Sequence, residues 1–197
     1  PNLLLYGSTG LGKTFLSTCV AEAVSARGFS VAYDTAINII AAYETIKFGN
    51  GDGAAAAERA ARYERADLLI IDDMGTEMGT AFTVSALYNL INNRLMAHRP
   101  MIVNTNLLPD ELKKRYSPAV ASRLLGEFKQ LRFSETISAC SRAGSRTVKN
   151  LSKTVQKLFT HYGAECGILT LSAREAAIPK LTTYRSFYFS FLPPFIL

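Results

Sequence analysis

Short apolar runs alternate along the chain with longer stretches in which apolar residues recur at helical spacing. Such alternation predicts an α/β fold, in which a parallel sheet is covered by helices. The runs that we expect to form strands are residues 2–6, 30–34, 68–72, 101–105 and 129–133. The stretches that we expect to form helices are residues 14–27, 35–47, 54–65, 80–98, 109–116 and 118–128.

The regular pattern ends near Ser134. Positive and negative charges balance over residues 1–139, so the net charge of +6 falls in residues 140–197. We therefore divide the chain into a core, residues 1–133, and an atypical basic tail, residues 134–197. Because periodicity and charge balance fail together here, we hypothesise that the tail is frame-shifted or poorly ordered. Its charge is then no evidence for a DNA-binding arm.

The sequence GSTGLGKT at residues 7–14 matches the phosphate-binding loop pattern GxxxxGK[ST], between a predicted strand and a predicted helix. Glycines let backbone N–H groups converge on phosphate oxygens, and the helix adds its positive N-terminal end. Lys13 would place a charge between the β- and γ-phosphates, and the Thr14 hydroxyl would coordinate Mg²⁺. We predict that ATP is bound by Gly7, Ser8, Thr9, Gly10, Leu11, Gly12, Lys13, Thr14 and Phe15.

Two adjacent carboxylates, Asp72 and Asp73, end the most apolar predicted strand. A buried parallel strand would present them at its carboxyl edge, where ligands of open α/β sheets bind. We expect Asp72 to hold Mg²⁺ with Thr14, and Asp73 to orient or deprotonate the attacking water. Together with the phosphate loop, the acid pair predicts ATP hydrolysis.

Five separated blocks of the core resemble one family. They read GSTGLGKTFL, LLIIDDMGTE, LYNLINNRL, IVNTNL and ASRLL. In this order they resemble the DnaC-type bacterial replicative helicase loaders, with the IstB-type transposition ATPases as close relatives, within the AAA+ class. The resemblance covers about residues 2–133 and implies a P-loop NTPase of the ASCE type, a three-layer fold. In such a sheet the strand 101–105 separates the phosphate-loop strand from the strand that ends at Asp72.

The resemblance also assigns two further catalytic residues. It places Asn106 at the sensor position that reads the γ-phosphate and helps to place water. It matches Arg123 with the arginine finger, which in this class acts on ATP bound by a neighbouring subunit, and so implies a homo-oligomer. Hydrolysis is expected to be slow, because Asp73 reaches less far than the glutamate of many AAA+ proteins. The family's closing sensor arginine has no clear equivalent in residues 131–140.

As partners, the resemblance implies the replicative DNA helicase and single-stranded DNA. Residues 113–116, Lys-Lys-Arg-Tyr, are a basic cluster with an aromatic neighbour, a combination that binds single strands or simply ends a solvated helix. A transposition helper ATPase of the IstB kind is the nearest alternative. A small-molecule phosphotransferase and a nucleotide-dependent adaptor without turnover are alternatives from other classes.

No apolar stretch approaches the roughly 20 residues of a membrane span, so we expect no membrane association. Three scattered cysteines, Cys19, Cys140 and Cys166, form neither a disulfide framework nor a metal-binding motif. A reducing, cytoplasmic location is therefore expected. Because the chain opens directly on a predicted strand without an initiating Met, we expect it to be N-terminally truncated.

Overall fold

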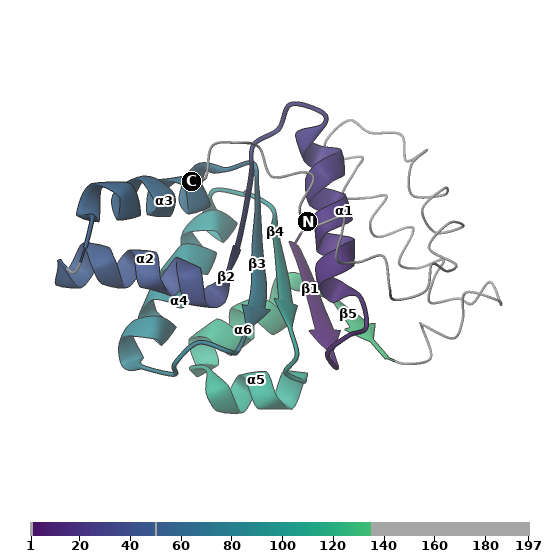
Figure 1. The fold of residues 1–197 in the computed structure, drawn as a ribbon. Coiled ribbons are helices and arrows are strands. Elements are labelled where there is room, and N and C mark those ends of the chain that lie inside the picture. Colours follow the sequence, from purple (N-terminus) through teal and green to yellow (C-terminus); the bar gives the residue numbers. More distant parts are fainter. Residues whose placement is uncertain (1, 50, 135–197) are drawn as a thin grey trace. The chain divides into compact units, whose positions relative to one another are not determined.

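The computed structural model describes residues 2–49 and 51–134, which form a five-stranded sheet with helices on both faces (Figure 1). The strands are β1 (Asn2–Gly7), β2 (Val31–Thr35), β3 (Leu68–Met74), β4 (Met101–Thr105) and β5 (Phe128–Phe133). The helices are α1 (Lys13–Ser25), α2 (Ala36–Phe48), α3 (Gly53–Arg65), α4 (Ala81–Met96), α5 (Pro109–Arg115) and α6 (Pro118–Gly126). The expected α/β fold is confirmed. Apart from Ser134, the predicted tail lies outside the described residues.

The strand order is β2-β3-β4-β1-β5, and every neighbouring pair is parallel. Strand β4 therefore lies between β1 and β3, as the resemblance implied. From β1 the chain continues to β2 at one edge of the sheet, and from β4 it continues to β5 at the other edge. The carboxyl ends of β1 and β4 thus form the point at which the connections reverse direction, where open parallel sheets bind their ligands.

Alternate residues of the strands face two different helical layers. Leu4, Leu69, Ile71 and Val103 belong to one buried cluster with residues of α2, α4 and α6. Among the described residues, none from α1 belongs to that cluster, although α1 contacts β2, β3 and β4. Helix α1 therefore covers one face of the sheet, and the helices that follow it cover the other (Figure 1).

The helix termini show how the phosphate loop differs from the loops that precede α2, α3, α4 and α6. The side chains of Thr35, Asp52, Thr80 and Ser117 accept hydrogen bonds from first-turn backbone N–H groups, and so cap α2, α3, α4 and α6. Helix α1 instead begins after Gly12, which has a φ of 92° and offers no side-chain cap. Its first N–H groups are left for an anion.

A buried arginine joins α4 to the end of α3. Arg94 is 0% exposed, and its Nη1 donates to the backbone oxygens of Tyr63, Glu64 and Ala66 at 2.8, 3.1 and 3.0 Å. Its Nη2 donates to the backbone oxygen of Pro100 at 2.8 Å. These carbonyls include orphan acceptors of the α3 C-terminus, so Arg94 fixes the α2–α3 hairpin to the layer that contains α4.

Most predicted boundaries differ from the observed ones by a residue or two. The predicted helix 118–128 included Phe128, whereas this residue begins β5 and pairs with Asn2. The spacing of apolar residues alone could not predict that Phe128 pairs with Asn2.

Within the described ranges, the structure contains no helix with the length and apolar character of a membrane span.

Candidate functional site

The phosphate loop connects β1 to α1. Gly7, Gly10 and Gly12 have φ angles of 135°, 76° and 92°, which favour glycine. At Gly7 a Cβ atom would lie 2.1 Å from the backbone oxygen of Phe133, so no larger residue fits between β1 and β5. Ser8, Thr9, Gly10 and Gly12 are exposed, as is Phe15 in the first turn of α1, while Leu11 is partly buried. This open loop suits the predicted phosphate site.

Lys13 is buried at the start of α1, with 6% of its surface exposed. Its Nζ donates to the backbone oxygens of Gly7 and Ser8 at 2.6 and 2.8 Å, and to Oδ1 of Asn106 at 2.7 Å. Burial lowers the pKa of Lys13 below the usual lysine value, although the charges of Asp73 and Asp72 raise it. The lysine predicted to bind phosphate thus contacts the asparagine predicted to sense it.

Asp72 is 5% exposed and lies at the centre of a hydrogen-bond network. Its Oδ1 accepts hydrogen bonds from Thr14 Oγ1 at 3.3 Å and from Asn104 Nδ2 at 2.9 Å. Its Oδ2 accepts one from the Tyr33 hydroxyl at 2.5 Å. Donors on both carboxylate oxygens fix the orientation of this side chain.

The donor set fits Mg²⁺. A hydroxyl and a carboxylate from Thr14 and Asp72 lie together, and Mg²⁺ prefers such oxygen ligands. The described part of the chain contains no group of three or more His, Cys, Asp or Glu side chains that could hold a metal. Magnesium would therefore need phosphate and water oxygens as its remaining ligands, which is typical of nucleotide sites.

Asp73 is exposed and has a φ of 50°, in the left-handed region. Its backbone oxygen accepts hydrogen bonds from the Thr76 amide at 3.3 Å and from the Thr76 hydroxyl at 2.8 Å. The register shift between Ile71 and Met74, near the end of β3, therefore separates the two acids: Asp72 is held inside the network, and Asp73 faces solvent. Such a division suits a metal ligand beside a group that acts on water.

The polar residues that support Asp72 were not predicted from the sequence. Asn104 and Ser17 are buried, and Ser17 Oγ lies 2.8 Å from Asn104 Oδ1 and 3.1 Å from the backbone oxygen of Lys13. Tyr33, in the middle of β2, was missed as well. One signal was available, because Asn104 interrupts an otherwise apolar strand, and a buried amide needs partners.

Arg123 is not brought to this site by any contact that the structure shows. It lies on α6, its side chain is 38% exposed, and its Nη1 is 3.9 Å from Oε1 of Glu127. Helix α6 leads into β5, whose first residue pairs with Asn2 at the end of β1 opposite the phosphate loop. The arginine-finger role stays a prediction.

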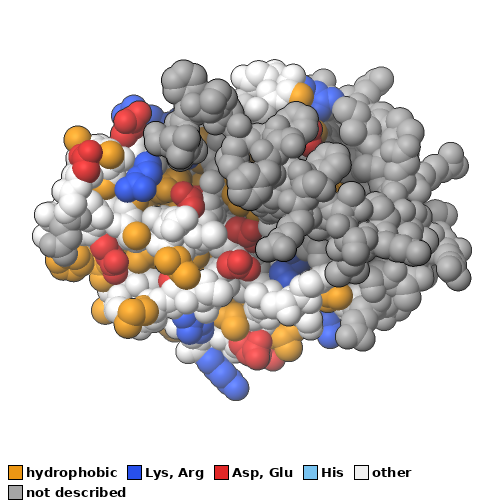
Figure 2. All heavy atoms as spheres, viewed as in Figure 1, with side chains coloured by type: hydrophobic (Ala, Val, Ile, Leu, Met, Phe, Trp, Pro, Cys, Tyr) orange, Lys and Arg blue, Asp and Glu red, His pale blue; other side chains and the backbone are white. Residues whose placement is uncertain are grey.

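The basic cluster at residues 113–116 is only partly available to a ligand. Tyr116 is buried and donates its hydroxyl hydrogen bond to Glu77, so its ring is no stacking platform for bases. Arg115 also contacts Glu77, and Lys113 pairs with Asp110 at 3.1 Å. On the face shown in Figure 2, acidic and basic side chains are interspersed over the described surface. The tyrosine is therefore structural, contrary to the stacking interpretation.

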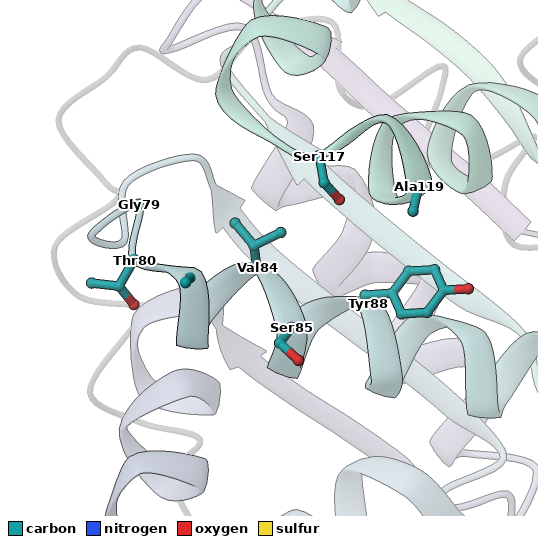
Figure 3. A pocket seen from close by; sticks show the side chains of 8 residues that line it. Gly79, Thr80, Val84, Ser85, Tyr88, Ser117 and Ala119 are labelled. Carbon is teal, nitrogen blue, oxygen red and sulfur yellow. The ribbon is translucent and has the colours of Figure 1, made fainter.

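A shallow hollow of about 470 Å³ lies elsewhere, between the beginnings of α4 and α6 (Figure 3). Val84 and Tyr88 line it from α4, and Ser117 and Ala119 from the start of α6. None of its lining residues belongs to the phosphate loop or the acid pair. It is therefore separate from the predicted nucleotide site.

The sheet order, the loop after β1, the acid pair near the end of β3 and the asparagine after β4 define a P-loop NTPase of the AAA+ class. Comparison with known proteins narrows this class. The family model described as "IstB-like ATP binding protein" matches residues 1–150. The chain belongs to this IstB-like ATP-binding family.

Individual relatives share only part of their length with this chain. An ATP-binding protein in an insertion sequence of Mycobacterium tuberculosis is 28% identical over 125 residues, which cover 63% of this chain and 48% of the relative. The AMPPCP-bound DnaA of Aquifex aeolicus has a TM-score of 0.58 at 24% identity, over 80% of this chain and 45% of that one. The DnaC helicase loader has a TM-score of 0.58 at 19% identity, over 68% of this chain and 78% of that one. Both structures share the fold.

Proposed function

We propose that this protein hydrolyses ATP and acts on DNA during the transposition of an insertion sequence. The observation that supports hydrolysis is the contact of Lys13 with Asn106 beside the Thr14–Asp72 pair, with Asp73 next to Asp72 near the end of β3. The family, and a relative that belongs to an insertion sequence, support transposition. This order reverses the sequence analysis, which ranked helicase loading ahead of the transposition helper.

In the proposed reaction, Lys13 exchanges its contacts with the loop carbonyls for oxygens of the β- and γ-phosphates. Asn106, already hydrogen-bonded to the lysine amine, then lies beside the γ-phosphate and orients the attacking water. Asp73 accepts a proton of that water as the water oxygen bonds to the γ-phosphorus, and the bond between the γ-phosphorus and the β–γ bridging oxygen breaks to release ADP. Magnesium, held by Thr14 and Asp72, would neutralise charge that develops on the phosphate oxygens.

Arg123 is proposed to complete the site of a neighbouring copy. Its position on α6, toward the opposite end of the sheet from its own phosphate loop, supports action in trans. A guanidinium offers planar, paired donors to charge on a transferring phosphoryl group. The monomer would then hydrolyse ATP slowly, and a homo-oligomer in the cytoplasm would be the active form.

Helicase loading is the second candidate. The five sequence blocks that resemble DnaC-type loaders, together with the fold shared with the DnaC structure, support it. In this case the partners would be the replicative DNA helicase and single-stranded DNA. Both candidates use the same nucleotide site, so the partner that stimulates hydrolysis distinguishes them.

The experiment is a steady-state ATPase assay of the full chain, alone and with single-stranded DNA, duplex DNA, the transposase of the same element or the cognate replicative helicase. Stimulation by the transposase supports transposition, and stimulation by the helicase with single-stranded DNA supports loading. Phosphorylation of a small hydroxyl acceptor would instead indicate a phosphotransferase. ATP binding without turnover, unchanged in Asp73→Asn, would indicate an adaptor and contradict the proposed hydrolysis.

A further inference from the structure

Glu77 is a buried carboxylate in the loop that joins β3 to α4. It is 3% exposed, although it lies only four residues after the exposed Asp73. Burying a carboxylate is costly unless donors surround it. Its hydrogen-bond partners therefore show which segments of the chain Glu77 connects.

Those partners come from two segments. Within the loop, the backbone N–H of Gly75 donates to Oε2 of Glu77 at 2.8 Å. From the end of α5, the Tyr116 hydroxyl donates to Oε1, and Nε of Arg115 lies 4.0 Å from the same oxygen. Arg115 also donates to the backbone oxygen of Glu77. Glu77 thus fastens the loop after β3 to the C-terminal end of α5.

The first fastened segment carries Asp73. Gly75, which Glu77 holds through its amide, lies two residues after Asp73 and has a φ of 110°. A Cβ atom on Gly75 would lie 2.7 Å from Cδ1 of Leu107, so this turn packs closely against the residue after Asn106. A shift of Gly75 would therefore move the end of β3, where Asp73 lies.

The second fastened segment follows Asn106. Helix α5 begins three residues after this asparagine, and the Thr105 hydroxyl beside it donates to the backbone oxygen of Met74 at 2.6 Å. The turn after β3 and the turn after β4 are therefore joined twice, once next to the sheet by Thr105 and once at a distance by Glu77. The outer connection joins two buried residues, Glu77 and Tyr116, with Arg115, whose side chain is 32% exposed.

We propose that Glu77 is a positioning residue for ATP hydrolysis, which fixes the separation of Asp73 and Asn106 by clamping the turn after β3 to α5. The role rests on the proposed function, because it concerns the hydrolytic step. Glu77 acts through the backbone of Gly75. Loss of the clamp would misplace the group that activates water without removing the phosphate loop.

The cleanest probe is Tyr116→Phe, which removes one hydrogen bond to Glu77 and keeps the buried ring. A matched control is Tyr63→Phe, since Tyr63 is also buried and donates to a carboxylate, Asp34 Oδ2, at 2.7 Å. For both variants and for Glu77→Gln we would measure kcat, KM, the ATP dissociation constant and Tm. Active sites would be counted by nucleotide titration, so that a loss of folded protein does not lower kcat.

We expect Tyr116→Phe and Glu77→Gln to lower kcat about 10- to 100-fold, the range that a small misplacement of catalytic groups produces. ATP dissociation constants should stay within about twofold, because the phosphate loop is intact. Tyr63→Phe should lower Tm without changing kcat per site. Equal kcat values in all three variants and the wild type would overturn the inference, as would a loss of ATP affinity in place of kcat.

The proposed function and this inference fail differently. Wild-type protein that binds ATP without hydrolysing it, with every DNA and protein partner present, would contradict the proposed function and the clamp with it. Wild-type hydrolysis that Tyr116→Phe and Glu77→Gln leave unchanged would contradict the clamp alone.

Discussion

Replacing Asn104 by leucine tests whether the network around Asp72 stabilises the fold and the metal site together. Asn104 is 1% exposed, and its amide donates to Asp72 Oδ1 at 2.9 Å. Leucine has the same number of side-chain heavy atoms with the same branching at Cγ, so Asn104→Leu removes the hydrogen bonds without opening a cavity. Ser17 keeps the backbone oxygen of Lys13 as an acceptor at 3.1 Å. The principal loss is therefore one hydrogen bond to a buried carboxylate.

A hydrogen bond to a charged group contributes about 1.5–3 kcal/mol. Asp72 retains Thr14 and Tyr33 as donors, so we expect the free energy of unfolding to fall by about 2 kcal/mol, which for a core of this size lowers Tm by about 6–10 °C. Because Asp72 loses a fixed orientation, ATP affinity in the presence of Mg²⁺ should also fall by about tenfold, while the affinity measured in EDTA stays the same.

Urea unfolding and ATP titration with Mg²⁺ or EDTA would measure both effects. Ser17→Ala is the matched control, since it removes the other partner of Asn104 and leaves the Asn104–Asp72 hydrogen bond in place. We expect it to cost about 1 kcal/mol and to spare the magnesium dependence. Two results would contradict the role of the Asn104–Asp72 hydrogen bond. One is a change in the free energy of unfolding of less than about 0.5 kcal/mol for Asn104→Leu. The other is an equal loss of magnesium-dependent ATP affinity in both variants.

Three further outcomes are expected. Arg94→Met should lower the free energy of unfolding by about 3 kcal/mol or more in urea melts, because the α3 carbonyls lose a buried donor; no change would contradict the bracing role. Burial raises the pKa of Tyr43 and Tyr63 above the ordinary value of about 10. Because the unfolded chain releases these protons at a lower pH than the folded chain, the free energy of unfolding should fall as pH rises above about 10. Tyr63→Phe should reduce that fall in pH-dependent melts, and an unchanged slope would contradict the contribution of Tyr63. Arg123→Ala should bind ATP normally yet hydrolyse it about 10³-fold more slowly. If the arginine acts in trans, mixing this variant with Lys13→Ala should restore part of the activity, because the Lys13→Ala subunits still supply Arg123. Mixtures as inactive as their components would refute that role.

The elements of the core were predictable because local signals agree with the tertiary structure. Apolar runs bounded by glycine or proline became strands, and prolines at positions 109 and 118 opened α5 and α6 as expected. The phosphate loop and the acid pair were readable because each is a contiguous motif. The place of β4 between β1 and β3 came only from the family resemblance, since strand order depends on contacts between distant segments.

The supporting residues could not be predicted in the same way. Asn104, Ser17 and Tyr33 come from β4, α1 and β2, and they meet at Asp72 only once the sheet has formed. Glu77 stands inside one of the blocks that carried the resemblance, yet its burial depends on α5. A charged residue in a polar loop is ordinarily exposed, so the sequence gives no sign of the clamp.

ATP titration and single-turnover hydrolysis, measured on Lys13→Ala and Asp73→Asn beside the wild type, test most directly whether the loop and the acid pair form one nucleotide site. We expect Lys13→Ala to weaken ATP binding at least about 50-fold, and Asp73→Asn to bind ATP like the wild type while hydrolysing it at least about 100-fold more slowly. ATP binding that Lys13→Ala leaves unchanged, or hydrolysis that persists in Asp73→Asn, would contradict the assignment of this site.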